Sequence, residues 1–335
     1  MLERFLIVWL LLSSGLAYVW PAVFPSTVVD PFLASASYLW LLITVTMFCL
    51  GWMLPREEVR EIGRRWPAVL GGTALQYLTM PALAAGACWL FGFEGDMLIG
   101  VVMVGCVPGA MASNVLTLLA RGNTSYSVSL TTMATLASPL AVPLVMGLAM
   151  RWAAVEEKAI EPAFFWKLGL SLLNMVVLPV LAGYLLNLKF PQWEKTAHRL
   201  GSLVANVTIL WVIAVVVASN RDQLSRVTLL LVAALLLVNL MGYLVGYLGG
   251  AAFRLPEPMR RALTLEIGMQ NAGLGAQLAL QMFPENTSVA IAPAFYTFAC
   301  MLTGTALARF WALRSMAAEG PPDEDLPPEE PQPAS

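Results

Sequence analysis

The sequence predicts an all-α polytopic membrane protein. Of its 335 residues, 59% are apolar and only 12% are Asp, Glu, Lys or Arg, which is about half the charged fraction of a typical soluble domain. A spanning helix with its connection takes about 30 residues, so the chain has room for about ten spans. Apolar runs of spanning length recur along the chain up to residue 313. We therefore expect ten transmembrane helices.

The first apolar run, residues 5–24, follows the charged residues Glu3 and Arg4 and in that respect looks like a signal peptide. Its apolar part is long enough to cross the bilayer, and many more spans follow it. We expect it to be retained as the first helix.

Each of the nine later runs is bounded by charged residues, proline or glycine, which commonly punctuate helices. In order along the chain, these runs cover residues 33–54, 67–91, 96–120, 124–150, 163–188, 200–219, 226–253, 258–283 and 287–313.

The lysines and arginines predict how the ten spans are oriented, because basic residues gather in cytoplasmic connections. One side receives 14 basic residues: Arg4, Arg56, Arg60, Arg64, Arg65, Arg121, Lys189, Lys195, Arg199, Arg254, Arg260, Arg261, Arg309 and Arg314. The other side receives five: Arg151, Lys158, Lys167, Arg221 and Arg226. We expect a multi-pass protein of the bacterial inner (plasma) membrane, with both termini in the cytoplasm.

Two spans contain residues that weaken a helix at its middle. The fourth includes segment 107–114, with a Pro-Gly pair, and the ninth includes segment 266–273, with two glycines. If the chain is divided into repeats of about 1–157 and 158–318, each break falls in the fourth of five helices. An odd number of helices gives the two repeats opposite orientations. This pattern is typical of inverted-repeat transporters, whose broken helices cross at the bilayer midplane.

Glu266 is the only acidic residue well inside an expected span. A carboxylate there costs several kcal/mol unless it is paired, solvated or protonated, and no Lys or Arg lies at a comparable depth. A cation from outside the protein is its natural partner. Oxygen-bearing side chains of the kind that hard cations prefer occur in neighbouring spans: Gln76, Ser113, Asn114, Ser127, Thr131 and Gln270.

Four short motifs stand in the fourth, fifth and ninth spans and in the connection between the fourth and fifth: ASNV at 112–115, ARGN at 120–123, LASP at 136–139 and EIGMQN at 266–271. Through these motifs the sequence resembles the bile acid:sodium symporter family over residues 1–315. The resemblance implies that the transmembrane domain, residues 1–318, has a core of spans 3–5 and 8–10 and a panel of spans 1, 2, 6 and 7.

The resemblance also implies two sodium ions as coupling ions. Carried onto matching positions, the first sodium site would use Ser113, Asn114, Ser127, Thr131 and Glu266. The second sodium site would use Gln76, Glu266 and Gln270, with the backbone carbonyls of Ile267 and Met269.

Organic anions are the substrates that the resemblance implies. Unwound segments leave amides unsatisfied at the start of a half-helix, where the dipole is positive, so an anion fits there. We expect these amides to come from about Gly109 to Ser113 and from Asn271 to Gly273, with the Asn271 side chain as the best placed polar contact. The substrate-binding residues are predicted as Gly109, Ala110, Met111, Ala112, Asn271, Ala272 and Gly273.

One departure concerns the substrate. Many relatives have a second glycine followed by threonine after the Pro-Gly pair, whereas this chain has Ala110 and Met111. A thioether therefore replaces a hydroxyl beside the expected carboxylate. We expect a different or more apolar substrate.

The predicted function is sodium-coupled uptake, by alternating access, of an organic anion such as a bile acid-like or small carboxylic acid. Alternatives from the same class are a proton-coupled organic-acid carrier, a cation/proton antiporter of the same fold in which Glu266 exchanges a proton, and an arsenite carrier that uses Cys106. A receptor or scaffold without transport is also open. An intramembrane enzyme is disfavoured, because Ser113 has no His or Lys within its motif to act as a base.

The net charge, the histidine and the cysteines limit the partners that this chain can have. A net charge of −2 argues against binding to nucleic acid. The single histidine, His198, lies in a charged connection, and the four cysteines lie in apolar stretches without a CxxC pair, which disfavours a zinc site. We expect the partners to be the small organic anion and the lipid bilayer, with no obligate protein partner evident. Residues 319–335, with six acids and six prolines, predict a disordered cytoplasmic tail.

Overall fold

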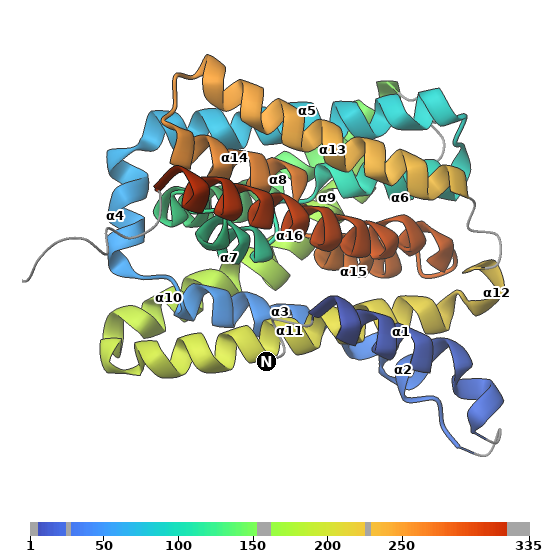
Figure 1. Ribbon diagram of the computed structural model, residues 1–335. Helices are drawn as coiled ribbons and strands as arrows, with labels where there is room; N and C mark the ends of the chain where they lie inside the picture. Colours follow the sequence, from blue (N-terminus) through green and yellow to red (C-terminus); the bar gives the residue numbers. More distant parts are fainter. Residues whose placement is uncertain (1–5, 25–27, 153–161, 225–228, 320–335) are drawn as a thin grey trace, which may run out of the picture.

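The computed structural model describes residues 6–24, 28–152, 162–224 and 229–319, and within these ranges its regular secondary structure is helical (Figure 1). Eight helical stretches are long and apolar enough to cross a membrane. Named by their helices, they are α1 (Leu6–Val23), α2 (Pro31–Ser35) with α3 (Leu39–Trp52), α5 (Trp66–Phe91), α8 (Thr124–Trp152), α9 (Pro162–Leu172) with α10 (Leu178–Lys189), α11 (Glu194–Ser219), α13 (Leu229–Ala252) and α16 (Ile291–Glu319).

The two runs expected to be broken form two pairs of shorter helices. They are α6 (Gly95–Cys106) with α7 (Ala112–Leu119), and α14 (Glu257–Gly268) with α15 (Ala272–Met282). Each of the ten predicted runs therefore coincides with one long helical stretch or one broken pair, and the predicted interruptions of the fourth and ninth runs are confirmed.

Two local features were not predicted. The connection after α3 is itself a helix, α4 (Arg56–Arg64), held by ion pairs from Glu61 to Arg64 (3.5 Å) and Arg65 (3.0 Å). The sixth run contains a π-helical turn, η4 (Leu173–Val177), between α9 and α10.

The helices form two layers (Figure 1). In the first layer, α3 packs against α10 and α11, and α1 packs against α11. In the second layer, α5 packs against α6, α8 and α13, and α13 packs against α14 and α16. Helix α4 runs between the two layers at the left edge of the view.

Glycines allow the backbones of α3 and α10 to approach closely. A Cβ on Gly51 would lie 1.9 Å from the carbonyl oxygen of Val180, and one on Gly183 would lie 2.0 Å from that of Phe48. Small residues at such contacts are a usual means of association between helices in lipid. Close backbone contact between α3 and α10 therefore helps to hold the first layer together.

Contacts near the helix ends define the two ends of the bundle. At the end near α4, Arg261 donates to the carbonyl of Ala120 at 2.9 Å. At the opposite end, Arg221 pairs with Asp30 at 2.5 Å. Most basic residues of the described ranges lie at the α4 end. This end includes the end of α10 and the beginnings of α11 and α14, where many of these residues stand. Which side of the membrane this end faces stays a prediction.

Exposed tryptophans stand near both ends of the bundle. Trp66 and Trp89 lie at the two ends of α5 and are 58% and 83% exposed. Tryptophan is enriched at the two membrane–water interfaces, and α5 at 1.5 Å per residue is long enough to join them. This pattern supports an integral membrane protein.

Two predictions concern residues that the structure does not describe. Residues 320–335, nearly all of the predicted tail, lie outside the described residues, and Glu319 is the last residue of α16. The proposed repeat boundary near residue 158 falls in 153–161, which also lies outside them.

Candidate functional site

The unwound segments of the two broken pairs lie side by side. Gly109 and Gln270 form an isolated antiparallel bridge. Its flanking hydrogen bonds run from the amide of Ala110 to the carbonyl of Met269 (2.7 Å) and from the amide of Asn271 to the carbonyl of Pro108 (2.8 Å). The second layer therefore contains a crossing of two interrupted helices.

Proline accounts for the first interruption. Pro108 has no amide to donate, and its ring disfavours the helical conformation of the preceding residue. Val107 accordingly has an extended backbone, with φ −72° and ψ 157°. The first interruption is therefore encoded locally.

The second interruption, after Gly268, contains no proline and is stabilised by polar side chains from α13 and α16. The carbonyl of Gly268 accepts hydrogen bonds from the Nδ2 group of Asn239 (2.7 Å) and the hydroxyl of Tyr296 (2.8 Å). The hydroxyl of Thr303 donates to Oδ1 of Asn239 at 2.6 Å. Sequence reasoning missed this group. The available signal was Asn239, a polar amide within an apolar run.

Glu266 lies two residues before this interruption and is fully buried. Its Oε2 accepts hydrogen bonds from the hydroxyls of Ser113 (2.6 Å) and Thr131 (2.7 Å). Within the described parts of the chain, its Oε1 has no hydrogen-bond partner. A buried carboxylate oxygen without a partner carries a large desolvation cost, so this position is suited to a cation.

The residues predicted for the first sodium site form one network. Oδ1 of Asn114 accepts hydrogen bonds from Ser127 (2.7 Å) and Thr131 (3.3 Å). Thr131 also bonds Glu266, so α7, α8 and α14 meet there. The hydroxyl of Thr117 donates to Ser127 at 3.2 Å. Thr117 was not predicted, although it lies four residues after Ser113 and therefore on the same face of α7.

The residues predicted for the second sodium site form an adjoining group. Gln76 donates to Oε1 of Gln270 at 3.2 Å, and Gln270 donates to the carbonyl of Ile267 at 2.6 Å. The carbonyl of Met269 already accepts the amide of Ala110. Glu266 forms its hydrogen bonds with residues of the first network. The two groups adjoin because Ile267, whose carbonyl accepts from Gln270, directly follows Glu266 in the chain.

The expected free amides of the substrate segments are partly occupied, which corrects the sequence prediction. The amides of Ala110, Ser113, Asn271 and Ala272 donate to backbone carbonyls. The physical reason is that unwound segments lying side by side satisfy one another, and each also forms local turns. The amides of Gly109, Met111, Ala112 and Gly273 are left as candidate donors.

The side chain of Asn271 also has a local role. Its Oδ1 accepts the amide of Leu274 at 3.1 Å and caps α15. Only its Nδ2 group is left to contact a substrate. Ala110, Met111 and Ala112 are partly exposed, whereas Gly273 is buried, close to Ile209 of α11. Of the predicted substrate residues, Gly273 therefore lies where the second layer meets α11 of the first layer.

Gly109 leaves room beside Glu266. A Cβ at position 109 would lie 1.9 Å from Oε1 of Glu266. Any residue larger than glycine would therefore occupy the space next to the unpartnered oxygen.

The donor atoms of this site suit a small hard cation. The side chains in the first network offer one carboxylate, one amide oxygen and several hydroxyls, which are ligands for hard cations. The described ranges contain no cluster of three or more His, Cys, Asp or Glu side chains placed to hold a metal ion. The four cysteines are free and buried.

Comparison with known proteins gives a consistent result. A family model described as the sodium bile acid symporter family matches residues 40–227. An uncharacterized sodium-dependent transporter of Bacillus subtilis is 33% identical, over 91% of this chain and 90% of that protein.

More distant relatives carry similar names. A probable sodium/metabolite cotransporter of Arabidopsis thaliana, described as chloroplastic, is 30% identical over 80% of this chain and 65% of its own length. A sodium-dependent organic anion transporter of Mus musculus is 26% identical over 70% of this chain and 61% of its own length. These are names of transporters, which supports the expectation that the chain is not an enzyme.

Proposed function

From the premise that this chain belongs to the sodium bile acid symporter family, a family of sodium-dependent transporters, we propose that it carries an organic anion inward together with two sodium ions. The observation that carries this proposal is the buried, unpartnered Oε1 of Glu266 beside a network of hydroxyl and amide oxygens.

The first sodium ion binds at this network. Oε1 of Glu266 supplies the negative charge, and oxygens of Ser113, Asn114, Ser127 and Thr131 supply the remaining ligands. These side chains come from α7, α8 and α14, so one ion would fix three helices at the crossing.

The second sodium ion binds in the adjoining group. Its ligands are side-chain oxygens of Gln76 and Gln270, the carbonyls of Ile267 and Met269, and the Glu266 carboxylate. Because Gln270 now bonds both Gln76 and the Ile267 carbonyl, binding here requires these hydrogen bonds to rearrange. We expect the second ion to bind more weakly than the first.

The organic anion binds at the crossing, against the amides of Gly109, Met111, Ala112 and Gly273 and the Nδ2 group of Asn271. Two sodium ions, the Glu266 carboxylate and one monovalent anion sum to zero charge, which lowers the cost of enclosing them. Each cycle moves one surplus positive charge, so a negative interior drives uptake by about 2.3 kcal/mol per 100 mV.

Transport proceeds by movement of the two layers against each other. The second layer serves as the core domain (spans 3–5 and 8–10) and the first as the panel domain (spans 1, 2, 6 and 7), within ten spans arranged as two inverted repeats. The contact between α15 and α11 supports this proposal, because α15 begins at the second proposed substrate segment and packs against the first layer.

A thermal-shift screen of organic acids tests the proposed function and identifies the substrate. The purified full chain is heated with each acid in sodium chloride and, at equal ionic strength, in choline chloride. We expect at least one organic anion to raise the unfolding midpoint only when sodium is present, because ligand and ion stabilise the same folded state. Equal stabilisation by that anion in choline would contradict sodium coupling.

A further inference from the structure

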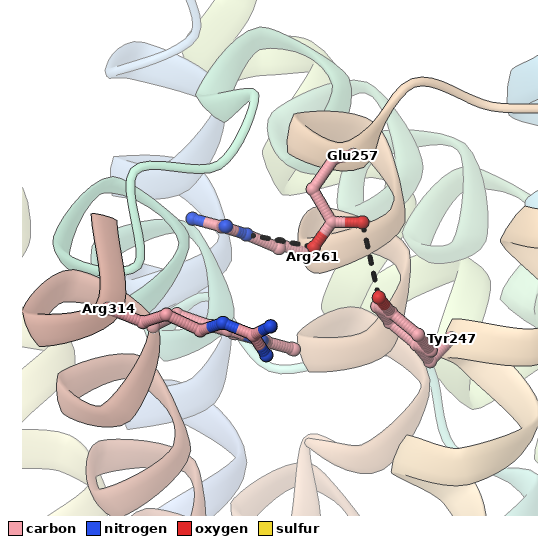
Figure 2. A pocket seen from close by; sticks show the side chains of 5 residues that line it. Tyr247, Glu257, Arg261 and Arg314 are labelled. Carbon is pink, nitrogen blue, oxygen red and sulfur yellow. Dashed lines mark hydrogen bonds and ion pairs between the residues drawn. The ribbon is translucent and has the colours of Figure 1, made fainter. Parts of the chain in front are cut away.

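A second polar site lies at the α4 end of the bundle, away from the crossing. It is a pocket of about 320 Å³ lined by Tyr247, Glu257, Arg261, Trp311 and Arg314 (Figure 2). These residues come from the end of α13, the beginning of α14 and the last turns of α16. None of them belongs to the proposed sodium or substrate sites.

The pocket has a fixed wall. Glu257 pairs with Arg260 (3.6 Å) and Arg261 (3.2 Å) and accepts the hydroxyl of Tyr247 at 3.2 Å. Arg261 also donates to Ser315 (2.9 Å) and to the carbonyl of residue 120 described above. The guanidinium of Arg260 lies 3.9 Å from the centre of the Tyr247 ring. These contacts hold the orientation of Arg261.

Arg314 is the exposed charge of the pocket. Its side chain points into the opening in Figure 2, and the residue is exposed. Among the described residues, no acidic partner is recorded for it. The three arginines at positions 260, 261 and 314 and the single carboxylate of Glu257 give the pocket and its wall a net charge of +2.

Exposed apolar residues lie close in sequence to the pocket-lining residues of α13 and α16. Phe310 and Leu313 on α16 are 55% and 65% exposed, and Leu248 and Phe253 at the end of α13 are 56% and 48% exposed. Trp311 is buried, and its ring stacks with that of Tyr247 at 6.3 Å. Tyrosine, tryptophan and arginine beside exposed apolar side chains are typical of the headgroup level of a membrane.

We propose that this pocket binds the phosphate headgroup of an anionic phospholipid, whose acyl chains lie along the exposed apolar residues of α13 and α16. A phosphodiester carries one negative charge, and planar guanidinium groups bind phosphate oxygens well. Basic pockets between transmembrane helices are suited to anionic headgroups. The bound lipid joins α13, α14 and α16 at the end predicted to be cytoplasmic.

Binding of phosphatidylglycerol to the purified full chain tests this proposal, with phosphatidylcholine as the zwitterionic comparison. Affinity is measured by native mass spectrometry and by the rise in unfolding midpoint in mixed micelles. We expect phosphatidylglycerol to bind more tightly than phosphatidylcholine. Arg314→Gln is expected to weaken phosphatidylglycerol binding about tenfold, the size of one lost charge-assisted hydrogen bond, and Arg314→Lys is expected to weaken it less.

Arg309→Gln is the matched control, because Arg309 is an exposed arginine of the same helix that does not line the pocket. It should leave the affinity within about twofold, because an exposed charge outside the pocket contributes little. Equal losses in Arg309→Gln and Arg314→Gln would show general charge attraction and overturn the proposal.

Two further experiments test whether the pocket binds something other than a lipid headgroup. Glycerol 3-phosphate should not stabilise the protein at concentrations where phosphatidylglycerol does, and equal stabilisation would assign the pocket to a soluble phosphate. A lipid preference that appears only in a chain ending at Glu319 would assign the pocket to the acidic segment 320–335. Either result would overturn the lipid proposal.

Discussion

At the scale of single residues, the two oxygens of Glu266 differ in their environment. Two hydroxyls satisfy Oε2, whereas Oε1 is buried without a partner in the described ranges. An isolated carboxylate at this depth costs several kcal/mol, and a bound cation would offset that cost. The carboxylate therefore carries the central role in the proposed coupling.

Gly109→Ala is predicted to remove the response to sodium. Its Cβ would lie 1.9 Å from Oε1 of Glu266, where the ion must approach. We expect the rise in unfolding midpoint on exchanging choline for sodium to disappear. Gly15→Ala, whose Cβ would meet nothing within 4 Å, should keep the full rise. A wild-type response in Gly109→Ala would contradict the proposed position of the ion.

At the scale of helices, the sequence predicts some features and misses others for identifiable reasons. The break at Pro108 is visible because proline acts on its own neighbours. The π-helical turn at Leu173–Val177 has no such signal. The predicted boundaries follow the charged connections, and because α4 is itself charged, the sequence predicts a connection there.

The support of the second break was also missed, because it depends on contacts between distant helices. Asn239 and Tyr296 approach Gly268 from α13 and α16, and a single sequence gives no pairing between those helices. The polar residues expected to bind sodium stand out because each carries oxygen atoms within an apolar run, whereas their grouping into two sites was implied by the family resemblance. That they act as binding sites stays a prediction.

Loss of both donors to Gly268 is predicted to destabilise the second break. Tyr296→Phe and Asn239→Ala should each lower the unfolding free energy by about 0.6 kcal/mol, a typical value for hydrogen bonds between membrane helices. The double variant should lose more than the sum, since the buried carbonyl then has no side-chain donor. The unfolding midpoints of the wild type, the two single variants and the double variant measure these losses.

Tyr38→Phe serves as the control for these variants, because Tyr38 is 62% exposed. Its midpoint should stay close to that of the wild type. Strictly additive losses in the double variant would show that the two side chains do not act on one carbonyl.

At the scale of the whole molecule, the position of the crossing matters most. The network around Glu266 lies within the second layer, whereas Gly273 lies close to Ile209 of α11 in the first layer. A cation at Glu266 would therefore organise the crossing beside the segments proposed to contact the substrate. This arrangement gives a physical route by which ion binding is coupled to anion binding.

The orientation of the molecule is predicted to place the α4 end in the cytoplasm. The four native cysteines are buried, so single introduced cysteines can be labelled with little background. In intact cells, a membrane-impermeant maleimide should label Glu285→Cys, and it should label Arg64→Cys only after permeabilisation. The reverse pattern would contradict the predicted orientation and the leaflet assigned to the lipid pocket.

The central claim is that Glu266 binds sodium, and a sodium titration of the unfolding midpoint tests it most directly. The wild-type midpoint should rise with sodium at constant ionic strength, by the linkage between binding and folding. Glu266→Gln, which keeps the shape of the side chain, should show no rise, while Glu285→Gln, which neutralises an exposed acid, should respond like the wild type. A full sodium-dependent rise in Glu266→Gln would contradict the account.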